Sequence, residues 1–287
     1  MDVMRLPWQT AVFREGLVQH RWSVAGLLPA FRMLVIPGVA GEPRLLVPPP
    51  ELLFLQLARQ CALTTTLMLG WELCGHYAKL TERDQRVRGT SQGFIGRDAL
   101  CTKAGIDALL ARMPRGVPGS ARARRAARLV RDRSRSPMET AVALMLFAPQ
   151  RLGGFGMPEP VVNGTMELQP RRDALMRSRL ELDLHWLDPL RVTEYNGFDF
   201  HEGKSKAQAA KDAIRHNELE IRQIPHLTLV GSEVMDRLRF QLNARNIAQM
   251  LNHRLRLETR DWNQRYERFH ADLLGLDYTP PEAYERL

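Results

Sequence analysis

Hydrophobic and polar residues alternate most regularly between Leu180 and Trp186, where apolar side chains take every second position and acidic residues or histidine fill the gaps. This period of two predicts a strand with one buried face. Asp188-Pro189 then indicates a turn. Residues 190–196 are expected to form the return strand of a hairpin.

The segments around this hairpin are patterned as helices and one further strand. Ser136-Pro137 followed by Glu139 predicts a helix start, with Ser as N-cap and Pro at the first helical position. The helix is expected to run to about residue 148 and to be buried. The other expected elements are a polar helix over 204–220, a short strand over 226–230, and helix from 232 to about 274 with Trp262, Tyr266 and Phe269 on one core-facing side.

The first part of the chain is predicted to be β-rich and then helical. Short apolar runs between Gly and Pro residues indicate strands over residues 11–50. After them a first helix is expected to begin near Glu51, a second to cover 63–78 and a third to cover 99–113, with a polar loop over 79–96 between the second and the third. A Pro- and Gly-rich linker over 114–120 and a basic helix over about 121–133 are expected to follow.

These elements together predict an α+β protein with an α/β core. The expected division has four parts: a β-rich and helical region over 1–115, a basic linker and helix over 116–135, a core domain over 136–236, and a C-terminal helical extension over 237–287. The core domain is expected to hold a mixed sheet flanked by helices.

Composition is that of an ordinary globular protein, with 44% hydrophobic and 25% charged residues. No apolar run reaches the roughly 18–20 residues that span a bilayer, so no membrane association is expected. The N-terminus has no secretory pattern. The three cysteines do not form a disulfide framework, which favours a cytoplasmic location.

The net charge is +9 and the pI about 10.0, which favours a polyanionic partner. Residues 112–135 contain nine arginines and one acid, so this segment accounts for almost all of the excess. It either contacts nucleic-acid phosphates or forms a solvated helix face that pairs with acids elsewhere. The candidate nucleic-acid-binding residues in it are Arg122, Arg124, Arg125 and Arg128.

Two carboxylates of the hairpin are the candidate metal ligands. Asp183 lies on the first strand, on the face opposite the leucines, and Glu194 on the second. A hairpin brings such residues close together, and paired carboxylates hold hard cations such as Mg²⁺. Asn196 points to the same side of its strand as Glu194, because they are two residues apart. The hypothesis is a Mg²⁺ site that activates water for attack on phosphorus.

The stretch from Glu194 to His201 (EYNGFDFH) resembles the E-x-D-G-x-x-x-H signature of very-short-patch-repair-like endonucleases, a family of the PD-(D/E)xK superfamily. Asp183 stands 11 residues before Glu194, as that family's metal-binding Asp does, and Glu139 resembles its upstream helical Glu. Residues 212–219 (DAIRHNEL) resemble its D-x-x-R-x-x-x-L helix. The resemblance covers about residues 134–236 and implies a restriction-endonuclease-like fold.

Residues 50–135 are also similar to the middle region of actinobacterial abortive-infection antitoxin-like proteins, which often end in this nuclease-like domain. The similarity rests on residues 49–58 (PPELLFLQLA) and 70–75 (GWELCG). Such proteins often begin with a winged helix-turn-helix, which this chain is expected to lack.

The resemblance implies a role for each matching residue. Asp183 and Glu194 would hold Mg²⁺, and Glu139 would position the site. His201 would assist proton transfer or contact phosphate. Lys204 and Arg215 could hold phosphate. Asn196 departs from the pattern, because the family has Asp there and an amide carries no charge, although it can donate a hydrogen bond or coordinate through its oxygen.

Structural explanations stand beside these roles. Glu139 is also explained as the third residue of a capping box, and Asp183 and Glu194 as solvent-facing strand residues. Three function classes therefore remain open: a DNA-binding Mg²⁺-dependent phosphodiesterase in phage defence, toxin–antitoxin or mobile-element biology; a non-catalytic DNA-binding or regulatory protein; and an antitoxin-like partner of a toxin-like protein.

Overall fold

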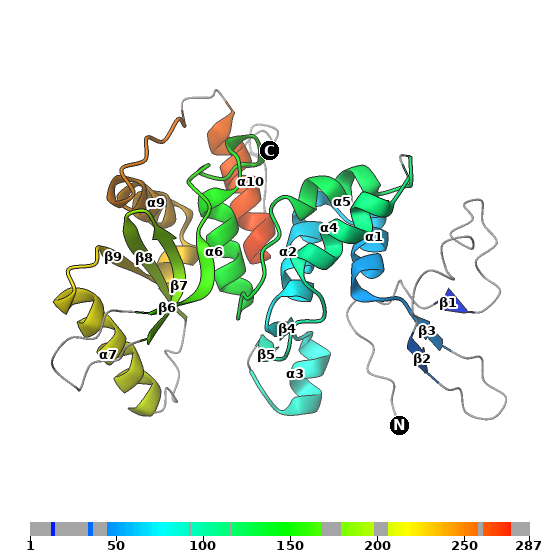
Figure 1. The fold of residues 1–287 in the computed structure, drawn as a ribbon, viewed down its shortest axis with the longest axis horizontal. Coiled ribbons are helices and arrows are strands. Elements are labelled where there is room, and N and C mark those ends of the chain that lie inside the picture. Colours follow the sequence, from blue (N-terminus) through cyan, green and yellow to red (C-terminus); the bar gives the residue numbers. More distant parts are fainter. Residues whose placement is uncertain are drawn as a thin grey trace, which may run out of the picture. The chain divides into compact units, whose positions relative to one another are not determined.

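The chain is an α+β protein that divides into two compact units, residues 1–132 and 133–287 (Figure 1). The computed structural model describes strands at 13–14 and 34–36, and then residues 45–276 except 92, 115, 168–178, 198–205 and 258–260. In the part of the chain so described, no helix combines the length and apolarity needed to cross a membrane.

The N-terminal unit combines a small sheet with helices. Strands β1 (Phe13–Arg14), β2 (Leu34–Ile36) and β3 (Leu45–Val47) form an antiparallel sheet in the order β1-β3-β2. The expected β-rich start is therefore present at these three positions. The helices that pack together after it are α1 (Pro50–Gln60), α2 (Leu63–Cys74), α4 (Lys103–Arg112) and α5 (Ser120–Ala127).

The segment expected as a polar loop holds regular structure instead. Helix α2 ends at Cys74 rather than near residue 78, and the chain continues into β4 (Tyr77–Lys79), which pairs with β5 (Phe94–Gly96). Between these strands lies α3 (Glu82–Arg88). Its first turn is closed by a capping box, in which Thr81 and Asp84 each accept a hydrogen bond from the other's backbone N–H. The prediction missed this helix because it has no buried residues and therefore no apolar stripe.

The basic helix is shorter than the predicted span of 121–133. Helix α5 ends at Ala127, and the chain then turns so that Val130 is completely buried. The indole Nε1 of Trp71 donates a 2.8 Å hydrogen bond to the carbonyl of Leu129 and so holds this turn. The arginine-rich helix is therefore part of the N-terminal unit and packs on its other helices.

The C-terminal unit is built around a four-stranded mixed sheet. Its strands are β6 (Val161–Glu167), β7 (Arg179–Leu187), β8 (Leu190–Asn196) and β9 (His226–Val230), in the order β6-β7-β8-β9. The first three are antiparallel, and β9 runs parallel to β8. The predicted hairpin and the strand over 226–230 are confirmed at these positions.

Helices surround this sheet. Before it comes α6 (Pro137–Phe147), capped by Ser136 as predicted, and between β8 and β9 runs α7 (Lys206–Ile221). Leu219 of α7 packs with Leu180, Leu182 and Val192 of the sheet in one hydrophobic cluster.

The expected C-terminal helix is divided into three parts: α8 (Gly231–Met235), α9 (Arg237–Met250) and α10 (Trp262–Leu274). The division at residue 236 arises because the Asp236 carboxylate accepts hydrogen bonds from two backbone N–H groups of α9 and so starts a new helix. The predicted aromatic face is confirmed, because Trp262, Tyr266 and Phe269 are all buried. Figure 1 shows α10 alongside α6.

Candidate functional site

Glu139 lies in the first turn of α6, and its carboxylate accepts hydrogen bonds from two other residues of the C-terminal unit. Oε2 accepts hydrogen bonds from the Arg135 backbone N at 2.9 Å and from Nδ2 of Asn163 at 2.7 Å. Ser136 Oγ accepts the Glu139 N–H, as expected of an N-cap. The carboxylate therefore ties the start of α6 both to the residue before the cap and to β6.

Asp183 and Glu194 are neighbours across the β7–β8 hairpin. The register that pairs Leu184 with Thr193 brings the two acidic residues next to each other. Asp183 Oδ2 accepts a 2.9 Å hydrogen bond from the Tyr195 backbone N, which fixes one carboxylate oxygen on the hairpin. The side chain of Glu194 is buried, with 8% of its surface exposed.

Arg215 of α7 reaches both of these carboxylates. Its Nη2 lies 3.0 Å from Glu194 Oε2, and its Nη1 lies 4.0 Å from Asp183 Oδ1. The guanidinium therefore partly neutralises the acidic pair.

These side chains line one open pocket of about 570 Å³. It brings together five of the residues singled out in the sequence, namely Glu139, Asp183, Glu194, Asn196 and Arg215. The other lining residues are Arg135, Tyr195, Gly197, Ala213, His216, Leu219, His226 and Thr228.

The remaining candidates are not among the described residues that line this pocket. His201 and Lys204 are outside the residues that the structure describes. The four candidate arginines of the basic segment belong to the N-terminal unit. In that unit Arg122 donates to the carbonyls of Ala58 and Cys61, and Arg124 donates to the carbonyl of Met113, so both help to close helix ends. Arg125 and Arg128 are exposed.

Several residues that line the pocket or bind its lining residues were not predicted. Arg135 was counted only as part of the basic segment, but its guanidinium forms a two-pronged ion pair with Glu181. Asn163, which the sequence analysis did not single out, lies buried within β6 with a positive φ of 44°, a backbone conformation that Asn tolerates better than most residues. His216 and His226 were not predicted as pocket residues either. The sequence offered one signal for a site here, because His216 and Glu220 have the i, i+4 spacing that places two side chains on one face of a helix.

The acidic groups of the pocket influence one another. Burial raises the pKa of Glu139 above its usual range, and the nearby charge of Asp183 raises it further. Next to the pocket, the hydrogen bonds from Arg135, which lines it, lower the pKa of the Glu181 carboxyl. The Glu139 carboxyl therefore resists ionisation in the absence of a cation, whereas pairing with Arg135 favours ionisation of the Glu181 carboxyl.

The raised pKa of Glu139 predicts how stability depends on pH. Below the ordinary glutamate pKa of about 4.3 the group is protonated in both states. As pH rises, Glu139 ionises first in the unfolded chain, so the wild type should lose stability relative to Glu139→Gln until pH passes the raised value. The measurement is denaturant unfolding of both proteins from about pH 4 to 8.

Any hydrogen bond that Gln makes less well than Glu adds a constant offset to this comparison. The informative quantity is therefore the change of the stability difference with pH. A difference that stays constant across the range would show that Glu139 ionises equally in both states, contrary to the burial of its carboxylate.

The donor chemistry of the pocket fits a hard divalent cation. Glu139, Asp183 and Glu194 provide carboxylate oxygens and Asn196 an amide oxygen, and Mg²⁺ prefers oxygen ligands. The repulsion between Glu139 and Asp183 is of the kind that a bound cation relieves.

No family model, curated protein or solved structure matches the chain.

Proposed function

We propose that the chain is a DNA-binding protein whose C-terminal unit is a PD-(D/E)xK nuclease-like domain, acting as a Mg²⁺-dependent DNA phosphodiesterase in defence or toxin–antitoxin biology. One observation carries the proposal: carboxylates from α6, β7 and β8 (Glu139, Asp183 and Glu194) meet in a single pocket. These three acidic groups, up to 55 positions apart in the sequence, repel one another, and the Arg215 guanidinium offsets this repulsion only in part.

The architecture of the unit supports the proposal. A helix, three antiparallel strands, a second helix and a parallel fourth strand follow one another in the order α6-β6-β7-β8-α7-β9. This fits the mixed sheet flanked by helices that the nuclease resemblance implies. A fold does not by itself specify chemistry, so the acidic pocket bears the argument for function.

Four residues of the pocket have a role in this proposal. Asp183 and Glu194 would hold Mg²⁺, with Glu139 positioning the site from α6. When bound, Mg²⁺ polarises a phosphoryl oxygen and acidifies water. Arg215 would turn from the carboxylates to a phosphate of the substrate, since a guanidinium binds either group in the same two-pronged way. His201, which lies outside the described residues, stays the candidate for proton transfer.

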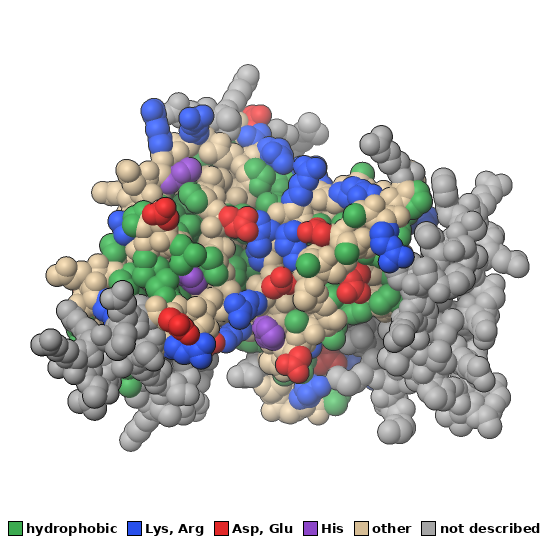
Figure 2. Space-filling view, viewed as in Figure 1, with side chains coloured by type: hydrophobic (Ala, Val, Ile, Leu, Met, Phe, Trp, Pro, Cys, Tyr) green, Lys and Arg blue, Asp and Glu red, His purple; other side chains and the backbone are tan. Residues whose placement is uncertain are grey.

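The basic segment supplies the proposed nucleic-acid contact. Arg125 and Arg128 are exposed on the N-terminal unit, and Figure 2 shows basic side chains over the region of α5. Arg122 and Arg124 already bind backbone carbonyls, so their first contribution is to hold the helices together. Contacts between exposed arginines and phosphates give an affinity for nucleic acid that falls steeply with salt and does not depend on base sequence.

A second candidate function is a non-catalytic DNA-binding or antitoxin-like regulatory protein on the same fold, with a toxin-like protein as a possible partner. The observation that favours it is the ion pair between Arg215 and Glu194 at 3.0 Å, because the guanidinium supplies a positive charge where the metal would sit. Asn196 adds to this, since the amide carries no charge.

Metal titration and plasmid nicking with one wild-type preparation separate the two functions. The phosphodiesterase is expected to bind Mg²⁺ or Mn²⁺ in calorimetry and to nick supercoiled plasmid, and a chelator should stop the nicking. The non-catalytic protein would bind no metal at millimolar concentration, yet would still shift DNA in a gel with an affinity that falls as salt rises. A wild type that binds neither metal nor DNA would contradict both DNA-binding functions and leave the antitoxin-like one.

A further inference from the structure

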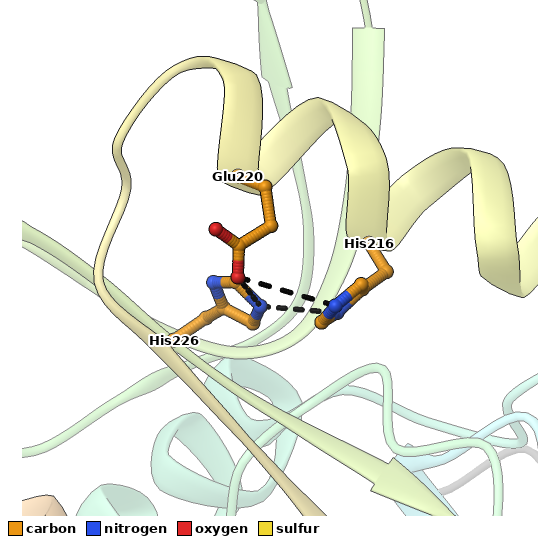
Figure 3. A group of neighbouring side chains, drawn as sticks. All are labelled: His216, Glu220 and His226. Atoms are coloured by element: carbon orange, nitrogen blue, oxygen red, sulfur yellow. Dashed lines mark hydrogen bonds and ion pairs between the residues drawn. The ribbon is translucent and has the colours of Figure 1, made fainter.

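Three potential metal-binding side chains converge where α7 leads into β9. His216 and Glu220 lie one turn apart on α7, and His226 is the first residue of β9 (Figure 3). His226 Nε2 lies 3.1 Å from His216 Nδ1 and 3.6 Å from Glu220 Oε1. One potential ligand atom from each residue lies within 4.8 Å of the other two.

The hydrogen bonding of His226 orients its ring for binding a metal. Its Nδ1 is 2.9 Å from the Ile224 carbonyl oxygen. A carbonyl can only accept, so in the neutral imidazole Nδ1 carries the proton and Nε2 the lone pair. That lone pair faces His216 and Glu220. Metal-binding histidines commonly have their second ring nitrogen fixed in this way by a carbonyl or carboxylate.

The spacing of the three groups suits a small transition-metal ion. Bonds of about 2.0–2.1 Å in a tetrahedral site place neighbouring ligand atoms about 3.3–3.5 Å apart. The two separations measured from His226 Nε2, 3.1 and 3.6 Å, lie on either side of that range. An ion could therefore enter with rotation of exposed side chains alone, because 56% of the His216 and 65% of the Glu220 side-chain surface is exposed.

We propose that His216, Glu220 and His226 form a binding site for a first-row transition-metal ion, with Zn²⁺ as the best match. Two imidazoles and one carboxylate are a ligand set that Zn²⁺ uses when it keeps one coordination position open. Imidazole nitrogen suits Zn²⁺, whereas Mg²⁺ prefers oxygen. The site is therefore chemically distinct from the carboxylates of Asp183 and Glu194.

Because of where the site lies, binding of the ion has two effects. The ion ties the end of α7 to β9 across the turn at residues 222–225, which stabilises that connection. His216 and His226 also line the acidic pocket, so the ion adds positive charge to the pocket wall. Its open position is then available to water or to an anionic group of a ligand.

The test is calorimetric titration of the full chain, without a histidine tag, with Zn²⁺ alone and in the absence of nucleic acid. The wild type is expected to bind one equivalent of Zn²⁺ and to gain thermal stability from it. His216→Gln and Glu220→Gln should each weaken binding at least about tenfold, since even the loss of an outer-shell partner costs that much. Both residues are exposed, so the folded unit should persist in both variants.

Two control variants make the result specific. His76→Gln removes another exposed histidine, in the N-terminal unit, and should leave Zn²⁺ affinity unchanged. Asp183→Asn should also retain Zn²⁺ binding, whatever it does to Mg²⁺, so this inference can fail or succeed independently of the proposed phosphodiesterase. Absence of binding by the wild type, equal affinity in the His216→Gln/Glu220→Gln double variant, or loss of Zn²⁺ in Asp183→Asn would each overturn the proposal.

Discussion

Asp183→Asn is expected to abolish Mg²⁺ binding and to slow plasmid nicking about a thousandfold or more. The ion supplies several kcal/mol of transition-state stabilisation in such reactions, and each loss of about 1.4 kcal/mol is a factor of ten in rate. The substitution is nearly isosteric. Asn keeps an oxygen that can accept the Tyr195 N–H, so the hairpin should retain its geometry. The measurement is the rate of conversion of supercoiled to open-circular plasmid at saturating Mg²⁺.

The matched control is Asp188→Asn on the same hairpin. Asp188 is exposed in the turn between β7 and β8 and does not line the pocket. It makes the same change in net charge, so it separates an effect on the site from an effect on overall charge. Nicking at the wild-type rate by Asp183→Asn would show that the activity does not depend on this pocket.

Elements with a strong local signal could be predicted from the sequence. The alternation over 180–186 specifies a strand because a period of two places the leucines on one buried face. Ser136 and Pro137 specify the start of α6, since cap geometry depends on neighbouring residues alone. Helix α3 was missed because its only signal was its cap.

The composition of the candidate site could be predicted only in part. Asp183 and Glu194 are joined by a short hairpin, so strand period and turn position were enough to bring them together. Glu139 entered through the resemblance alone. Local sequence patterns could not predict the contacts between distant segments. These are the pairings of Arg215 with Glu194, of Arg135 with Glu181 and of His216 with His226. Each of these depends on how α6 and α7 are placed on the sheet.

Tertiary placement also changed the interpretation of the basic segment. Taken as a sequence, nine arginines over 112–135 indicate one cationic surface. In the structure Arg122 and Arg124 bind carbonyls at the ends of neighbouring helices, and Arg135 pairs with an acid of β7. Part of the positive charge therefore stabilises the fold, and the proposed phosphate contacts depend on exposed candidates such as Arg125 and Arg128.

Trp262→Ala is expected to destabilise the C-terminal unit by about 3–5 kcal/mol, which is typical of losing a large buried aromatic side chain. Trp262 is 1% exposed, stacks on Tyr266 with ring centroids 5.1 Å apart, and meets Phe155 edge-on at 5.2 Å. Its Nε1 donates a 3.0 Å hydrogen bond to the Gly154 carbonyl. Denaturant unfolding is the measurement, with the two units expected to unfold in separate transitions if they are independent.

Two further variants identify the origin of this loss. Trp262→Phe keeps an aromatic ring but removes the N–H donor and leaves the Gly154 carbonyl without that hydrogen bond, so we expect a smaller cost of about 1–3 kcal/mol. Leu187→Ala truncates an apolar side chain that is 62% exposed and should change stability by less than about 0.5 kcal/mol. Helix α10 packs against α6, which carries Glu139, so the same cluster holds the acidic pocket in place. A Trp262→Ala protein as stable as the wild type would contradict this account of how the unit is held together.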